Sequence, residues 1–134
     1  MSGDPDVQAV VIADGASDTG SIRDAGGAFV EGRSLCSVRV PALTAGSAFL
    51  LLQTSESGPD VLDAAAVWDN LYDEDGVQIG KLPVSTAAAR RVCIQLGRFE
   101  RLGRCRFVAV QADGTTVQAQ TGAKTLHPRF REVR

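Results

Sequence analysis

The sequence predicts an all-β fold, a jelly-roll-like antiparallel β-sandwich of about eight strands. Three observations lead to this prediction. Apolar and polar residues alternate with a period of two in several short segments. Turn residues separate these segments at intervals of about a dozen residues, and no segment sustains a helical period. This pattern favours a sandwich over a barrel with a ligand-binding lumen or an α/β fold.

Residues 67–79 show the pattern most clearly, as two strands joined by an acidic turn. The dipeptide Asp75-Gly76 is typical of tight hairpin turns, because glycine adopts a positive φ angle without a steric clash. Asp14-Gly15 and Asp113-Gly114 predict two further turns of this kind. The expected strands cover residues 7–13, 33–40, 48–54, the two arms of the 67–83 hairpin, 90–96, 104–111 and 115–121.

Two of these segments differ in their expected burial. Residues 33–40 alternate, which is typical of a strand with one buried face, whereas residues 48–54 are almost continuously apolar and predict a central strand. Between the strands, residues 57–66 are expected to form one or two helical turns with Ser57 as the N-cap.

The chain of 134 residues is expected to fold as a single domain that needs no disulfide or metal to complete its core. Residues 1–6 are acidic and polar and are interpreted as a flexible arm. Residues 124–134 contain four basic residues, and Pro128 argues against a central strand there. We therefore predict a basic C-terminal arm over residues 124–134.

Composition restricts the classes of partner. No apolar run approaches the roughly 20 residues that a membrane-spanning helix requires, and residues 1–6 lack the apolar core of a secretory signal. The formal net charge is −2, which gives no broad electrostatic case for nucleic acid or anionic membranes. The expected protein is made in a cytoplasm and binds neither.

The cysteines Cys36, Cys93 and Cys105 are odd in number and widely spaced, without a CxxC pair. We expect three reduced thiols packed as small apolar groups, because free cysteine is usually buried. A single disulfide, or a metal site completed by His127, are the alternatives.

No motif predicts an enzyme. The chain has no GxSxG elbow and no glycine-rich phosphate-binding loop. The acidic turn fails the pattern of a calcium-binding loop, since Leu82 stands where a bidentate glutamate is needed after Gly76. We predict no catalytic, cofactor-binding or metal-binding residue. Paired carboxylates from distant strands, as in glycoside hydrolases, are the enzymatic alternative that sequence leaves open.

Arginines cluster in two regions and suggest a surface for a partner. We interpret them as a solvated strand face or a surface that meets an acidic protein, because nucleic-acid binding usually interleaves such charges with stacking aromatic residues. Here Phe99 and Phe107 have apolar neighbours suited to core packing. The arginines are Arg90, Arg91, Arg98, Arg101, Arg104 and Arg106, followed by Arg129, Arg131 and Arg134.

Trp68 and Tyr72 fall on the same side of their predicted strand. They are interpreted either as a half-buried aromatic pair or as an exposed contact patch for a partner or a sugar ring.

Several segments together resemble a known family. Leu71-Tyr72-Asp73-Glu74-Asp75-Gly76 is similar to a signature of small structural proteins of tailed-bacteriophage virions or related gene-transfer agents. The departures are residues 55–67, longer than the usual loop, and the extended basic segment 124–134. The similarity covers most of residues 8–126, and its other segments are residues 12–17, 33–44, 49–55, 84–96 and 104–111.

The resemblance implies a jelly-roll-type sandwich that lies on the virion, with no cofactor and no catalytic residue. The expected function is that of a capsid decoration (cement) protein, which binds the head surface and stabilises the shell. Its partners would be the major capsid protein or other virion proteins, and the copies would form a homo-oligomer such as a trimer. The alternative is an adhesin-like module of a head fibre, tail or baseplate that binds host glycans.

The residues expected to bind a partner come from the aromatic pair and the basic arm. They are Trp68, Tyr72, Lys124, Arg129, Phe130 and Arg131.

Overall fold

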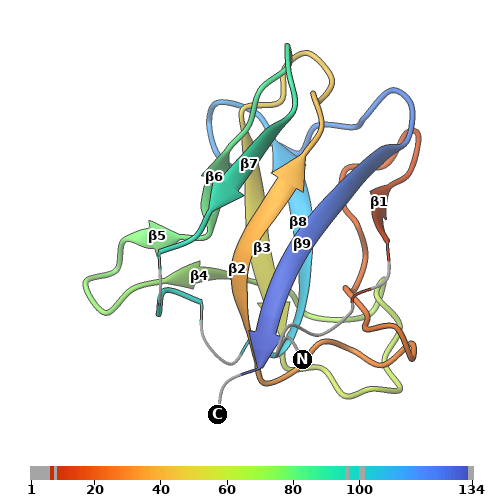
Figure 1. The fold of residues 1–134 in the computed structure, drawn as a ribbon, viewed down its shortest axis with the longest axis vertical. Coiled ribbons are helices and arrows are strands. Elements are labelled where there is room, and N and C mark those ends of the chain that lie inside the picture. Colours follow the sequence, from red (N-terminus) through yellow and green to blue (C-terminus); the bar gives the residue numbers. More distant parts are fainter. Residues whose placement is uncertain (1–6, 8, 96, 100–101, 133–134) are drawn as a thin grey trace.

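The computed structural model describes residues 7, 9–95, 97–99 and 102–132 of the chain. These residues form two antiparallel sheets that pack face to face, and they contain no helix (Figure 1). The predicted all-β sandwich is therefore confirmed. In this described part, no helix is long and apolar enough to cross a membrane.

The first sheet has the strand order β1-β9-β2-β7. Its strands are β1 (Val10–Ile12), β9 (Lys124–Glu132), β2 (Arg33–Val40) and β7 (Arg90–Cys93). All its pairs are antiparallel, and the register between β2 and β9 shifts between Leu35 and Ser37. This β-bulge shifts the alternation of β2 by one residue, so that Leu35, before the bulge, and Val38 and Val40, after it, all lie in the core.

The second sheet is built around β3 (Phe49–Ser55). β8 (Arg104–Val110) pairs with β3 along its whole length on one side, and β6 (Lys81–Pro83) and β4 (Asp69–Tyr72) pair with it in tandem on the other. β5 (Gln78–Ile79) pairs with β4. The prediction of a central, apolar strand over residues 48–54 is thus confirmed.

The core lies between the two sheets. Phe107 from β8 and Phe130 from β9 are fully buried there, and each buried side chain of this size contributes roughly 1.5–3 kcal/mol through the hydrophobic effect. Aliphatic side chains from both sheets fill the space around them: Ile12, Leu35, Val38, Val40, Leu50, Leu52, Leu82 and Leu126.

Residues 124–132 form β9, so the prediction of a basic C-terminal arm is wrong for them. β9 has neighbours on both sides, because β1 pairs with residues 124–126 and β2 with residues 127–132. Pro128 is tolerated because it lies beyond the last pair with β1, where the strand has only one neighbour. The predicted arm over residues 1–6 and residues 133–134 lie outside the described residues.

The hairpin predicted over residues 67–83 is present only in part, as β4 and β5. Residues 81–83 do not extend its second arm, because they form β6, which pairs with β3. Gly76 has a φ angle of 79°, which other residues rarely adopt, and the glycines of the two other predicted Asp-Gly turns also have positive φ angles. The expected partner strand over residues 115–121 is reduced to a single bridge between Val110 and Val117.

The long loop before β4 contains turns but no helix. A single helical hydrogen bond joins the amide of Ala66 to the carbonyl of Leu62 at 2.9 Å. The hydroxyl of Ser57 accepts a hydrogen bond from the amide of Val67 at 3.1 Å and therefore closes the base of the loop, where an N-cap role was expected.

Candidate functional site

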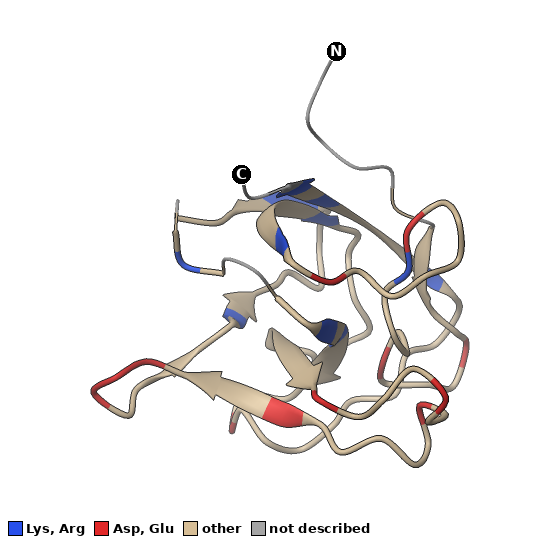
Figure 2. Cartoon of the chain, turned by 90° about the horizontal axis from the view of Figure 1, so that it is seen from below, with Lys and Arg blue, Asp and Glu red and all other residues tan. Residues whose placement is uncertain are grey.

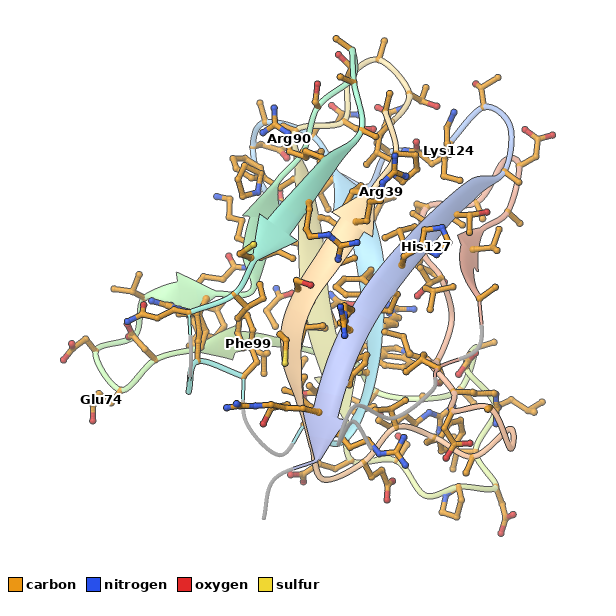
Figure 3. All side chains as sticks on the ribbon, viewed as in Figure 1. Arg39, Glu74, Arg90, Phe99, Lys124 and His127 are labelled. Carbon is orange, nitrogen blue, oxygen red and sulfur yellow. The ribbon has the colours of Figure 1, made fainter. Side chains whose placement is uncertain are left out.

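The outer face of the β1-β9-β2-β7 sheet is basic, and the register of the strands shows how. Arg39 of β2 lies directly opposite Arg91 of β7 and His127 of β9, and all three side chains are exposed. Lys and Arg gather along this sheet in Figure 2, and Figure 3 shows Arg39 and His127 on neighbouring strands. We call this surface the basic face; its outward side chains are Ser34, Ser37, Arg39, Arg91, Cys93, His127, Arg129 and Arg131.

Arg39 and Arg91 place like charges on directly opposite positions, which destabilises a sheet. Neither of them forms an ion pair with any residue that the structure describes. Arg91 donates a hydrogen bond from Nη1 to the hydroxyl of Ser37 at 3.1 Å, which holds it flat on the sheet. No ion pair among the described residues offsets the repulsion between these two arginines, and an anionic partner surface would offset it.

The tip of the β4–β5 hairpin is acidic and partly apolar. Its carboxylates Asp73, Glu74 and Asp75 are exposed, and Tyr72 and Val77 beside them are 58% and 60% exposed. Oδ1 of Asp73 accepts hydrogen bonds from the amides of Asp75 and Val77, both at 2.9 Å, so this carboxylate closes the turn. The hairpin projects from the body, with Glu74 at its end (Figure 3).

Trp68 belongs to an internal cluster and does not share an exposed patch with Tyr72. Its ring is half-buried, and the guanidinium carbons of Arg106 and Arg104 lie 4.4 Å and 5.6 Å from its centroid. Nε1 of Trp68 donates a hydrogen bond to the carbonyl of Asp63 at 3.2 Å. Of the two aromatic residues, Tyr72 is the one available to a partner.

Arg104 forms the centre of this cluster, with only 1% of its side chain exposed. It donates hydrogen bonds to Oδ1 of Asp63 at 2.7 Å, to the hydroxyl of Ser21 at 2.8 Å and to the carbonyl of Gly58 at 3.2 Å. Its guanidinium carbon also lies 4.3 Å from the ring centroid of Phe29. Arg104 therefore fastens the long loop before β4 to β8 and to the segment that follows β1.

The electrostatics of Asp63 follow from these contacts. Partial burial alone would raise the pKa of its carboxyl group, but hydrogen bonds from Ser21 and Arg104, together with the positive charge of Arg104, outweigh burial. They lower the pKa of Asp63 from 3.8 to about 2. The ion pair between Asp63 and Arg104 consequently stays charged at any pH well above that value.

The remaining expected contact residues separate into surface and core. Arg129 and Arg131 lie on the basic face, and Lys124 is half-buried at the start of β9 (Figure 3). Phe130 points into the core and is 0% exposed, so it offers no contact to a partner. Arg101 and Arg134, two members of the predicted arginine clusters, lie outside the described residues.

The three cysteines differ in exposure, so the expectation of three packed thiols is wrong for Cys93. Cys105 is buried in the core, and burial raises the pKa of its thiol to about 12. Cys36 is half-buried, and Cys93 is exposed on the basic face opposite Ser37. All three thiols are free.

This difference predicts selective chemistry, because the thiolate is the reactive form and Cys105 is both buried and held protonated. In the native protein at pH 8, Cys93 should react with a disulfide reagent first and Cys105 only after denaturation. Time-resolved titration of the thiols measures this, with Cys93→Ser expected to remove the fast phase. Equal rates for all three thiols would contradict their different burial.

Two open hollows lie near the edges of the sheets. One of about 420 Å³ lies between β6 and β7 and is lined by Leu82, Val92, Ile94 and Phe99, among others. The second, of about 210 Å³, is lined by Ser34, Leu35, Cys36, Ile94, Gly97, Phe99 and Arg131. No group of three or more His, Cys, Asp or Glu side chains in the described part of the chain is placed to hold a metal ion.

No family model, no curated protein and no solved structure matches the chain.

Proposed function

We propose that the chain is a non-enzymatic structural protein of a tailed-bacteriophage virion, most specifically a capsid decoration protein of jelly-roll type. In this role it binds the head surface through the major capsid protein or another virion protein and stabilises the shell. The single observation that supports docking is the basic face, where Arg39 and Arg91 lie opposite each other without an ion-pair partner among the described residues. The virion setting comes from the sequence resemblance.

The physical argument concerns the distribution of charge. The chain as a whole is slightly acidic, at −2, yet one sheet presents a basic face. Charge complementarity of this kind guides a protein to one orientation on its partner. The acidic hairpin leaves the body away from that face (Figure 2), so one copy can contact two neighbours at once. A rigid module with two contact surfaces is suited to reinforcing the joints of a shell.

Thermal melting of purified empty shells tests this proposal. Shells loaded with the protein should melt at a higher temperature than bare shells. At a free concentration about 100-fold above Kd, binding to the folded shell adds about 2.7 kcal/mol per site. The double variant Arg39→Glu, Arg91→Glu should lose most of this effect.

Arg90→Glu is the matched control. Arg90 is exposed and lies in the same strand as Arg91, but on the opposite side of that strand. It should stabilise the shells like the unmodified protein. Equal melting of loaded and bare shells would count against the decoration role.

A glycan-binding adhesin is the second candidate, and the exposure of Tyr72 favours it. Aromatic side chains provide flat apolar contacts for ring-shaped ligands. On a glycan array, an adhesin would lose binding with Tyr72→Ala while keeping its thermal stability. Trp68→Ala belongs in the same experiment, but its effect must be read beside a stability measurement, since Trp68 packs against Arg104 and Arg106.

A further inference from the structure

We propose that copies of this chain associate head to tail, with the acidic β4–β5 hairpin of one copy docking on the basic face of the next. The occupant of the basic face is thus a second copy of the same chain, which is then the virion protein that the proposed function places against this face. The biological setting of this inference rests on the proposed function, but the association itself is a property of the purified protein.

The basic face carries a row of basic side chains that crosses three neighbouring strands. Cross-strand neighbours are about 4.5–5.5 Å apart at Cβ, so Arg91, Arg39 and His127 form a line of about 10 Å across three strands. The line is exposed at all three positions. It lacks a carboxylate from its own chain in the described part, since the ion pairs formed by other arginines use Asp18, Asp24 and Asp63.

The hairpin tip offers the complementary charges in a fixed shape. Because Asp73 closes the turn with two amide hydrogen bonds, Glu74 and Asp75 are presented on an ordered loop. Less conformational entropy is lost on docking when the binding element is already ordered. The exposed Tyr72 and Val77 add apolar contact area beside the carboxylates.

An apolar hollow lies on the same sheet, toward the end of β2 away from Arg39. Ser34 and Arg131 belong to the basic face and also line this 210 Å³ hollow, whose lining includes Leu35, Ile94 and Phe99. An aromatic side chain inserted there would be surrounded by apolar groups, while neighbouring carboxylates meet arginines. Buried aromatic anchors ringed by polar contacts dominate the energy of many interfaces. Tyr72 of the docking hairpin has the chemistry for this position.

The hairpin cannot satisfy the basic face of its own copy. It belongs to the second sheet and projects away from the first one, as Figures 1 and 2 show. Contact between two different patches is heterologous, so it builds rings where the rotation closes and open chains where it does not. Either arrangement would link copies across a shell surface.

Sedimentation velocity of the purified full chain at low ionic strength tests the proposal. The unmodified protein should form species larger than a monomer as its concentration rises, and salt should weaken them because the contact is electrostatic. A face variant, Arg39→Glu with Arg91→Glu, and a tip variant, Glu74→Lys with Asp75→Lys, should each associate at least about tenfold more weakly.

Two controls match these charge reversals. Arg90→Glu reverses a charge in β7 that lies outside the basic face, and Asp60→Lys reverses the charge of an exposed acidic residue outside the hairpin. Both should associate like the unmodified protein. Thermal melting of every variant shows that it is folded.

Mixing the variants gives the sharpest result. The face variant keeps its acidic hairpin and the tip variant keeps its basic face, so an equimolar mixture should recover association between unlike copies. The reversed hairpin of the tip variant also matches the reversed face of the face variant, so the two variants should alternate in assemblies that grow beyond a heterodimer. A chain carrying all four reversals should regain self-association, because its charges are complementary again. The proposal is wrong if neither the mixture nor the chain with four reversals associates, or if the unmodified protein is a monomer at every concentration.

Binding of a labelled DNA duplex tests whether nucleic acid, and not a second copy of the chain, occupies the basic face. If the unmodified chain stays monomeric and binds DNA, and the face variant does not bind it, the basic face serves nucleic acid and the proposal is wrong. Shell melting separates this inference from the proposed function. If the protein stabilises shells but never self-associates, the head-to-tail association is wrong and the decoration role still stands.

Discussion

Replacing Phe130 by alanine should lower the free energy of unfolding by about 3–5 kcal/mol. Phe130 is fully buried, lies opposite Leu35 in the sheet and belongs to the core cluster between the two sheets. Its removal takes away hydrophobic transfer energy and leaves a cavity that a rigid sandwich fills only in part. The loss would be a large fraction of the stability of a domain of this size.

Urea denaturation followed by circular dichroism measures the change. His127→Ala is the matched control, since His127 is exposed on the same strand and its replacement should change stability by no more than about 0.5 kcal/mol. A Phe130→Ala variant with unchanged stability would mean that this side chain lies on the surface, as the prediction of a basic arm implied.

Asp63→Ala should cost about 2–4 kcal/mol, because it leaves the guanidinium of Arg104 buried without its carboxylate. The expected cost is about 1 kcal/mol below the roughly 3–5 kcal/mol for fully buried pairs, since 41% of the Asp63 side chain is exposed and water can partly replace it. The loop before β4 should loosen at the same time, because Asp63 also bonds to Ser21.

Arg104→Met provides the comparison for this network. It removes the buried charge and keeps most of the apolar stem, so it should destabilise the protein less than Asp63→Ala. Urea denaturation of both single variants and the double variant gives their coupling energy. If Arg104→Met were the more damaging change, the burial of an unpaired charge would not be the dominant cost.

The same pair predicts an acid-sensitive contribution to stability. The pKa of Asp63 is lowered by folding to about 2, from 3.8. A depressed folded pKa stabilises the native state above the unfolded value and loses that effect as pH falls. The stability difference between the unmodified protein and Asp63→Asn should therefore be constant above about pH 5 and shrink between pH 4 and pH 2. A difference that is as large at pH 2 as at pH 5 would contradict the ion pair.

Local sequence chemistry predicts much of this fold. The Asp-Gly turns, the strand over residues 33–40 and the apolar strand over residues 48–54 each depend on neighbouring residues alone, and the structure confirms all three. The strict alternation predicted within residues 33–40 is wrong, because the bulge brings Leu35 to the core together with Val38 and Val40. The side chains of a strand alternate between its two faces within the strand itself, and the glycine that a tight turn requires lies within that turn. Such features need no knowledge of distant partners.

The features that sequence missed depend on pairing between distant segments. β9 reads as a basic, proline-containing arm until β1 and β2 are placed beside it. Arg104 reads as a solvated charge, because its partners Ser21 and Asp63 are 83 and 41 residues away. The row formed by Arg91, Arg39 and His127 exists only through the register of three strands. A clue was available for β9, since Leu126 and Phe130 share one parity.

We propose that this sandwich works by docking its charged surfaces on the proteins of a phage head. A cryo-EM reconstruction of the virion tests it most directly. We expect density that fits the two-sheet sandwich on the outer surface of the head, at junctions between capsomers, with Arg39 and Arg91 facing a protein neighbour. Density for this chain in a tail fibre or baseplate, or its absence from the particle, would contradict the account.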